Sequence, residues 1–176
     1  NSVFSFDLAF DPQIYHSKPA VGRASNRIAL YSRHGTPRRA VELGLLALEQ
    51  LARKHPDLEV DFFGQHIQPG QVSYRYRDLG MLAPVELAQL YREVTIGVVF
   101  SATNYSLVPH EMMACGLPVV ELQGKNNIAI YPQGVITLAQ PDPQRVAEAI
   151  SRLLTIPELR EARTCLLYTS PSPRDA

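Results

Sequence analysis

The chain has 176 residues, of which 45% are hydrophobic, and its 17 basic and 17 acidic residues cancel to a formal net charge of zero. This length suits one globular domain of ordinary size and excludes two full ones. Zero net charge argues against bulk attraction to nucleic acid or to an anionic membrane. No apolar run approaches the roughly 20 residues of a membrane-spanning helix. We therefore expect no nucleic-acid partner and no membrane span.

The cysteine content and the first residues of the chain indicate the cellular compartment of the protein. Cys115 and Cys165 are too few for a disulfide framework, so we expect a reduced, cytoplasmic protein. The chain opens on Asn1 rather than Met and shows no signal peptide. These features indicate a piece of a longer intracellular protein.

The first predicted elements are a connector and a strand. Residues 1–20 are irregular and contain Pro12 and Pro19, which indicates a connector before a domain that spans residues 21–163. A short apolar run at residues 28–32 predicts the first strand of that domain.

A long helix is predicted next. Thr36 is suited to the N-cap and Pro37 to the first helical position, and the helix is expected to run to about residue 55. Its leucines and alanines recur at helical spacing over a broad stripe. This breadth predicts a helix that packs on a sheet.

The junction between this strand and this helix carries three arginines. A strand, a glycine loop and a helix N-terminus form an anion site, because free N–H groups and the positive end of the helix dipole point at the ligand. Arg33 precedes the turn, while Arg38 and Arg39 fall in the predicted first helical turn, where each opposes the dipole by roughly 0.3–1 kcal/mol. A bound anion would offset this cost, since a charge-assisted hydrogen bond contributes about 1.5–3 kcal/mol. From the residues alone, phosphate binding and a solvated basic face both stay open.

The remaining apolar runs and helical patterns complete an order of strands and helices. Residues 65–78 are polar and aromatic, residues 79–82 are short and apolar, and residues 123–131 read as a loop because of Gly124 and an Asn-Asn pair. The further predicted strands are residues 58–64, 95–100, 117–122 and 135–138, and the further predicted helices begin at Pro84, Pro109, Pro143 and Pro157.

The stretch at residues 104–121 combines a loop, a short helix and a buried strand. Pro109 suits the first helical position, Glu111 falls in the first turn, and Gly116 suits the cap that ends the helix. In parallel α/β sheets, ligands bind outside the carboxyl ends of the strands, so Glu111 is a candidate ligand residue. A carboxylate that merely complements the helix dipole is the alternative.

The ten residues that start at Glu111, EMMACGLPVV, resemble the EAMACGxPVV segment of GT-B glycosyltransferases. The resemblance covers roughly residues 5–162. It implies a Rossmann-like α/β domain, a parallel sheet flanked by helices, which is the C-terminal, nucleotide-sugar-binding half of a GT-B fold. In that family the glutamate binds the ribose hydroxyls of the nucleotide, which implies this role for Glu111. Residues 79–82 would contact the base, mostly through backbone groups.

A second motif resembles the same family. Ser32-Arg33, with Arg38 in the lysine position, is similar to the GR-x-x-x-x-K element whose basic residues hold the donor diphosphate. This implies diphosphate binding by Arg33 and Arg38, with Arg39 as a further candidate. The longer stretch YSRHGTPRRAVELGLLAL resembles a YxRPxxPRxxFELGxxAL pattern of rhamnosyltransferases in bacterial cell-surface polysaccharide assembly. Rhamnose as the transferred sugar rests on this resemblance.

One departure affects the sugar end of the site. Many members carry a first glutamate eight positions before the second, and Thr103 occupies that position here. The GFG that usually follows is replaced by Asn104, Tyr105 and Ser106, which become candidates for the vicinity of the donor sugar. Retention and inversion of the anomeric configuration both stay open.

The catalytic machinery is expected elsewhere. In GT-B enzymes the acceptor site belongs to the N-terminal domain, so we expect no catalytic residue in this chain, and a glycan or lipid-linked glycan acceptor that meets the missing domain. The resemblance also implies a cytoplasmic enzyme or one held peripherally at the inner membrane. His110 beside Glu111 is interpreted as a packing or hydrogen-bonding residue. No histidine has metal-ligand spacing, and the resemblance implies no metal and no cofactor beyond the nucleotide-sugar substrate.

Two other functions stay open, together with the nature of the C-terminus. A nucleotide-sugar 2-epimerase shares this fold and donor site, and a non-catalytic nucleotide-binding α/β module is the alternative from another class. A dinucleotide dehydrogenase is disfavoured because no G-x-G-x-x-G follows a strand. Residues 164–176 lack periodicity and resemble a translated adaptor sequence, so we interpret them as a non-native tail, with a native tail as the alternative.

Overall fold

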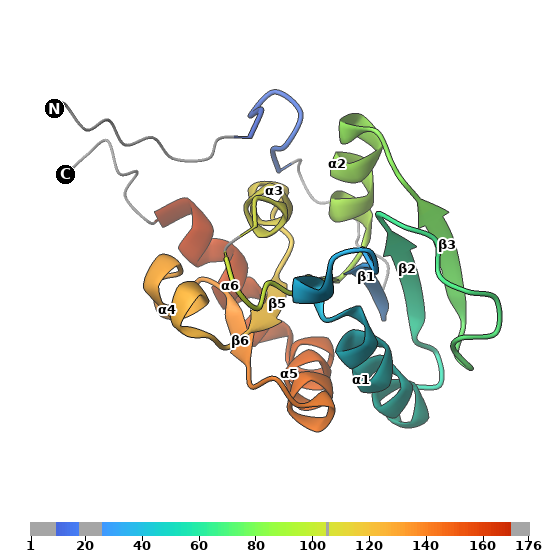
Figure 1. The fold of residues 1–176 in the computed structure, drawn as a ribbon. Helices are drawn as coiled ribbons and strands as arrows, with labels where there is room; N and C mark the ends of the chain where they lie inside the picture. Colours follow the sequence, from blue (N-terminus) through green and yellow to red (C-terminus); the bar gives the residue numbers. More distant parts are fainter. Residues whose placement is uncertain (1–9, 18–25, 105, 170–176) are drawn as a thin grey trace, which may run out of the picture.

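The computed structural model describes residues 10–17, 26–104 and 106–169, and these form a six-stranded parallel sheet with helices on both faces (Figure 1). The strand order is β3-β2-β1-β4-β5-β6, so the direction of winding reverses between β1 and β4. Ligands of such sheets bind at the carboxyl ends of the strands on either side of this reversal. The predicted Rossmann-like α/β fold is confirmed. The strands are β1 Arg27–Tyr31, β2 Glu59–Phe63, β3 Tyr76–Gly80, β4 Ile96–Val98, β5 Val119–Leu122 and β6 Thr137–Ala139.

Two hydrophobic clusters hold the helices on the sheet. Side chains of α1 and α5 pack with one face, and side chains of α2 and α3 with the other, as Figure 1 shows. Successive residues of β1 alternate between the clusters, Ile28 and Leu30 in one and Ala29 in the other. The helices are η1 Pro37–Arg39 (a 3₁₀ turn), α1 Val41–Lys54, α2 Pro84–Glu93, α3 Val108–Ala114, α4 Lys125–Ile130, α5 Pro143–Thr155 and α6 Pro157–Thr169.

Small residues let two helices approach the sheet closely. A Cβ atom at Gly97 of β4 would overlap the Met112 sulfur and approach Leu117 to 3.0 Å. A Cβ atom at Gly44 of α1 would lie 3.2 Å from Leu30 and from Phe100. The glycine in β4 therefore sets how near α3, with its first-turn carboxylate, lies to the centre of the sheet.

The helix predicted at residues 37–55 is interrupted. Pro37–Arg39 forms a 3₁₀ turn, Ala40 takes a left-handed conformation with φ of 42°, and α1 begins only at Val41. Thr36 makes no side-chain capping bond. The prediction that Arg38 and Arg39 occupy the first turn of α1 is wrong, because contacts of Arg39 with the end of β4 hold this segment in a separate turn.

Other elements differ from prediction in ways that tertiary contacts explain. The predicted loop at residues 123–131 contains α4, whose Asn127 is fully buried and donates to the carbonyl oxygens of Ser101 and Leu122. β3 arises in a segment that local pattern leaves irregular, because β2 pairs with it along its length. Helix α3 begins at Val108, so Pro109 takes the second helical position rather than the first.

The ends of the domain are partly described. α5 begins as predicted, with Asp142 accepting a hydrogen bond from the Arg145 amide at 3.0 Å. Helix α6 runs to Thr169, past the predicted domain end at residue 163. Residues 170–176 lie outside the described residues. The interpretation of residues 164–176 as a non-native tail therefore stays a prediction. None of the described helices is long and apolar enough to cross a membrane.

The described part of the predicted connector, residues 10–17, packs against α2. Tyr15 is buried and stacks on Tyr91 with ring centres 6.2 Å apart. Arg92 donates hydrogen bonds to the carbonyl oxygens of Ile14 and His16 at 2.6 and 3.0 Å. The connector is thus attached to the face of the sheet that α3 also covers.

Candidate functional site

The candidate site lies where the loops after β1 and β4 meet, at the point where the sheet order reverses. The Ala102 amide donates to the carbonyl oxygen of Arg38 at 3.0 Å, which joins the two loops. Arg33 is exposed and Arg38 is partly exposed. Neither side chain forms an ion pair with a described carboxylate, and the buried Nε of Arg38 makes no hydrogen bond with a described residue. Two positive charges therefore lie uncompensated at the edge where ligands bind.

Arg39 is placed differently from its neighbours. Its side chain is buried, and one terminal nitrogen donates to the Phe100 carbonyl oxygen at 3.2 Å and to Ser101 Oγ at 2.6 Å. The guanidinium carbon lies 5.1 Å from the centre of the Tyr31 ring, within the range of a cation–π interaction. Burial lowers the pKa of Arg39. Arg39 thus anchors the end of β4, and its predicted contact with a diphosphate stays a prediction.

The glycine loop after β1 is held by residues that follow β2. Ser32 is buried, and its hydroxyl donates to the carbonyl oxygens of Gln65 at 2.6 Å and Phe63 at 3.1 Å. In return, the Gly35 amide donates to Gln65 Oε1 at 2.9 Å. Gln65 therefore supports the loop that carries Arg33, a role that no local sequence pattern predicts.

Glu111 lies in the first turn of α3 as predicted, and its side chain is half-buried. Burial raises the pKa of its carboxyl group. Its charge acts on the two stacked tyrosines: burial first, and Glu111 second, raise the pKa of Tyr15 to about 12 and also raise that of Tyr91. The carboxylate makes no ion pair with a described basic residue. Its charge is thus not compensated by a described basic side chain, and its contact with a ribose stays a prediction.

The loop between β4 and α3 is only partly described. Ser106 is buried; its hydroxyl accepts a hydrogen bond from the Val108 amide at 3.3 Å, and its carbonyl oxygen accepts one from His110 Nδ1 at 3.2 Å. Ser106 therefore supports the start of α3. Asn104 is exposed, and Tyr105 lies outside the described residues. Contact of these three residues with a donor sugar stays a prediction.

His110 has the packing role expected from the sequence. Its ring lies 5.4 Å from the ring of Tyr131, and its Nδ1–H donates to the Ser106 carbonyl oxygen. Burial lowers the pKa of His110, which favours the neutral ring. A neutral ring held in this way stabilises the start of α3.

A polar cluster beneath the loops was not expected from the sequence. Its members, Arg39, Ser101, Glu121 and Asn127, are joined by hydrogen bonds to Ser101 at the ends of β4 and β5. Glu121 is fully buried. One signal could have identified it, because a glutamate inside an apolar strand, VVEL, requires partners that only the fold supplies.

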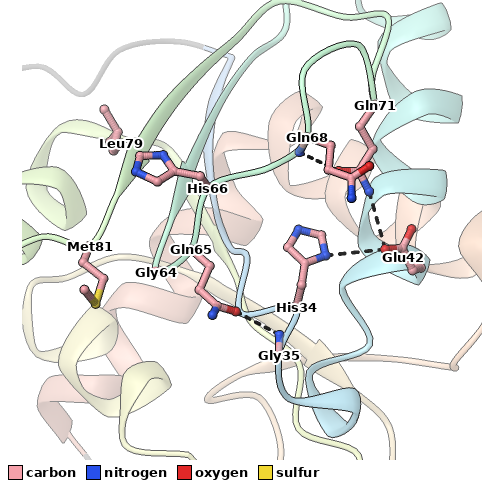
Figure 2. Close-up of a pocket in the computed structure, with 10 residues that line it drawn as sticks. All are labelled: His34, Gly35, Glu42, Gly64, Gln65, His66, Gln68, Gln71, Leu79 and Met81. Atoms are coloured by element: carbon pink, nitrogen blue, oxygen red, sulfur yellow. Dashed lines mark hydrogen bonds and ion pairs between the residues drawn. The ribbon is translucent and has the colours of Figure 1, made fainter.

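A pocket of about 920 Å³ opens beyond the carboxyl ends of β1, β2 and β3 (Figure 2). His34 faces Glu42 across one part of it, with Nδ1 and Oε1 3.5 Å apart, while Leu79 and Met81 line the other part. The base-binding segment implied by resemblance, residues 79–82, thus borders a cavity. Among the described residues, no three His, Cys, Asp or Glu side chains gather to hold a metal ion. The lining residues are His34, Gly35, Glu42, Gly64, Gln65, His66, Gln68, Gln71, Leu79 and Met81.

The family to which the chain belongs follows from its match to a known family model. A family model described as "WsaF, C-terminal domain" matches residues 26–151. The chain belongs to this family. As a WsaF C-terminal domain, it is also similar to the O-antigen biosynthesis protein RfbC of Myxococcus xanthus, with 35% identity over 155 residues. That match covers 83% of the chain and 12% of the relative, so the chain spans a small part of the relative's length.

Solved structures confirm the fold of this WsaF C-terminal domain. The C-terminal domain of a group 1 glycosyl transferase, LpcC of Francisella tularensis, has a TM-score of 0.71 and 17% identity, with 91% of this chain and 95% of that one covered. HepE of Anabaena, solved with UDP and glucose, has a TM-score of 0.70 and 18% identity, with 90% and 50% covered. The predicted C-terminal half of a GT-B fold is confirmed.

Proposed function

We propose that this domain binds the nucleoside-diphosphate sugar donor of a glycosyltransferase that builds a bacterial cell-surface polysaccharide. The observation that carries the proposal is the hydrogen bond between the Ala102 amide and the Arg38 carbonyl oxygen. It holds two uncompensated arginines beside the loop that leads into α3 and its Glu111. A diphosphate and a ribose joined to one another need cationic and hydroxyl-binding groups placed side by side in this way.

Each part of the donor has a candidate partner. Arg33 and Arg38 would bind the diphosphate, and Glu111 would accept hydrogen bonds from the ribose hydroxyls. The base would enter the pocket bordered by Met81. During transfer, negative charge develops on the leaving diphosphate, and arginines already placed there stabilise it without reorganisation. The acceptor site and any general base would belong to the N-terminal domain of the full-length protein.

The sugar and the acceptor are the finer part of the proposal. The relative named for O-antigen biosynthesis supports a glycan or lipid-linked glycan acceptor. The YSRHGTPRRAVELGLLAL stretch supports rhamnose as the sugar, because it resembles the pattern of rhamnosyltransferases. Transfer from dTDP-rhamnose by the full-length protein, followed with bacterial glycan acceptors, tests both points.

Donor binding can be tested with this chain alone. Its thermal stability is measured with dTDP, UDP, GDP and ADP, since a ligand at about 100 times its Kd should stabilise the fold by roughly 2.7 kcal/mol. We expect a shift with one base, lost in Arg38→Ala and in Glu111→Ala. Arg53→Ala is the matched control, because Arg53 is exposed in the last turn of α1. No shift with any nucleotide from a cooperatively folded sample contradicts the proposal.

A further inference from the structure

A buried carboxylate at the carboxyl ends of β4 and β5 has no part in the donor contacts proposed above. Glu121 is fully buried, and its Oε1 accepts hydrogen bonds from the backbone amides of Ser101 at 2.7 Å and Leu122 at 2.8 Å. Its Oε2 makes no hydrogen bond with a described residue. A buried carboxylate oxygen without a partner destabilises a fold. A purely structural role therefore explains Oε1, which has two hydrogen bonds, but not Oε2.

Ser101, the residue held by Glu121, is where three segments meet. Its hydroxyl accepts from Arg39 at 2.6 Å, and its carbonyl oxygen accepts from Asn126 and Asn127 at 3.1 and 3.3 Å. The next residue, Ala102, binds the Arg38 backbone. Glu121 therefore lies directly beneath the junction of the arginine loop, the loop into α3 and the start of α4.

The charged group that faces Glu121 from the neighbouring elements is Arg39. Glu121 accepts from the amide of Ser101, which follows β4, and pairs in register with Leu138 of β6. Asn127 of α4 donates to the carbonyl oxygen of the adjacent residue, Leu122. None of these three side chains titrates near neutrality. α3 covers the same face of the sheet and brings the titratable His110 and Glu111.

The ionisation of Glu121 is poised near neutral pH. Burial raises the pKa of its carboxyl group to about 7, although the amide hydrogen bonds and the Arg39 charge act in the opposite direction. The carboxylate thus compensates the Arg39 charge only in part of the neutral range.

We propose that Glu121 is a positioning residue of the donor site, and that it takes up a proton from solvent when the anionic diphosphate of the donor binds at the arginine loop. The proposal rests on the donor-binding function proposed above. A diphosphate brings negative charge to Arg39, the cation that Glu121 faces, and a second anion nearby disfavours the ionised carboxyl group. The proton would go to Oε2, the oxygen without a hydrogen bond. Oε1 would keep both amide bonds, so the loop geometry would survive protonation.

The test is calorimetric titration of the chain with dTDP-rhamnose and UDP-glucose between about pH 6 and about pH 8.5, a range that spans the Glu121 pKa of about 7. Each titration is repeated in two buffers that differ in ionisation enthalpy, which reports proton uptake. The doubly esterified diphosphate of a nucleotide sugar does not titrate in this range, unlike a terminal phosphate with a pKa of about 6. We expect uptake of up to about one proton and an affinity that falls roughly three- to tenfold as the pH rises.

Three variants separate charge from geometry. Glu121→Gln keeps the acceptor for Ser101 and Leu122, so it should bind with the affinity that the unaltered chain has at about pH 6, at every pH and without proton uptake. Glu121→Ala removes the acceptor and should bind more weakly throughout. Glu161→Gln, which alters an exposed carboxylate on α6, should behave like the unaltered chain. If Glu121→Ala does not fold, proton uptake and pH dependence in Glu121→Gln decide whether Glu121 has the proposed role.

The outcomes distinguish this inference from the proposed function. Binding without proton uptake, uptake that persists in Glu121→Gln, or full affinity in a folded Glu121→Ala would each overturn the role of Glu121 while donor binding stands. Failure of both nucleotide sugars to bind at any pH would overturn the proposed function, and the role of Glu121 with it.

Discussion

The backbone amide of Ala102 donates a hydrogen bond of 3.0 Å to the carbonyl oxygen of Arg38. This bond joins the loops after β1 and β4, the two strands between which the order of the sheet reverses. It leaves the Arg38 side chain at the edge where ligands bind, while the next residue, Arg39, turns into the protein. Two adjacent arginines thereby serve different purposes.

Substitution of each arginine should separate binding from stability. Arg38→Ala should weaken nucleotide binding and change the free energy of unfolding by no more than about 0.5 kcal/mol, because its side chain is partly exposed and unpaired among the described residues. Arg39→Ala should lower stability by about 1–3 kcal/mol, since Phe100 and Ser101 lose a charged donor. Urea denaturation and nucleotide titration measure both effects. Equal losses of stability in the two variants would contradict this division.

Glu111→Gln should lower nucleotide affinity by about tenfold or more, because hydrogen bonds from ribose to an ionised carboxylate are the stronger kind. The substitution should also change the stability of the nucleotide-free domain, in a direction that the pKa of Glu111 determines. Burial raises the pKa of Glu111, so its contribution to stability is full below the unfolded pKa of about 4.3 and is lost as the pH rises through the folded value. The variant should therefore be no less stable than the unaltered chain at neutral pH. Denaturation curves of both proteins at several pH values test this. A Glu111→Gln variant that is less stable than the unaltered chain at neutral pH would refute it.

Gly97→Ala should destabilise the domain by about 1–3 kcal/mol. The added Cβ would overlap the Met112 sulfur and crowd Leu117, which forces α3 away from β4. Because Glu111 moves with α3, nucleotide affinity should fall as well. Gly70→Ala serves as a surface comparison, since nothing lies within 4 Å of a Cβ there, although its φ of 76° adds backbone strain. A stable Gly97→Ala with unchanged affinity would exclude close packing as the reason for this glycine.

The pH dependence of stability should report Glu121 in the absence of ligand. Its folded pKa of about 7 exceeds the unfolded value of about 4.3, so its stabilising contribution is full below pH ~4 and is lost progressively up to about pH 7. Relative to Glu121→Gln, the unaltered chain should lose on the order of 3 kcal/mol across this window. Chemical denaturation of both proteins from about pH 4 to about pH 8 measures the difference. Parallel curves would show that Glu121 does not titrate there.

Asn127→Ala should cost about 1–3 kcal/mol, because the buried carbonyl oxygens of Ser101 and Leu122 each lose a donor. Asn126→Ala should cost less, since Asn126 is only partly buried and Ser101 retains the bond from its neighbour. Hydrogen exchange at α4 should rise in the first variant. Similar exchange in the two variants would mean that α4 does not depend on Asn127.

Local chemistry predicted the elements whose signals are contained in a few adjacent residues. Asp142 and Pro143 start α5 as an N-cap and a first helical residue do, and Gly116, with φ of 73°, ends α3. Contacts across the fold decided other elements. The helix expected from Pro37 breaks at Ala40 because Arg39 is bound to the end of β4, and the predicted loop forms α4 because Asn127 has two partners on other segments.

The sequence by itself determined the fold class, most of the strands and helices with the exception of β3 and α4, and the motifs that carry Arg33, Arg38 and Glu111, because each depends on residues close together in the chain. Only the tertiary structure decided that Arg39 is buried, that Ser101 joins three segments, and that Glu121 has a pKa near neutrality. These properties arise from burial and from hydrogen bonds between residues far apart in sequence, which no local pattern encodes.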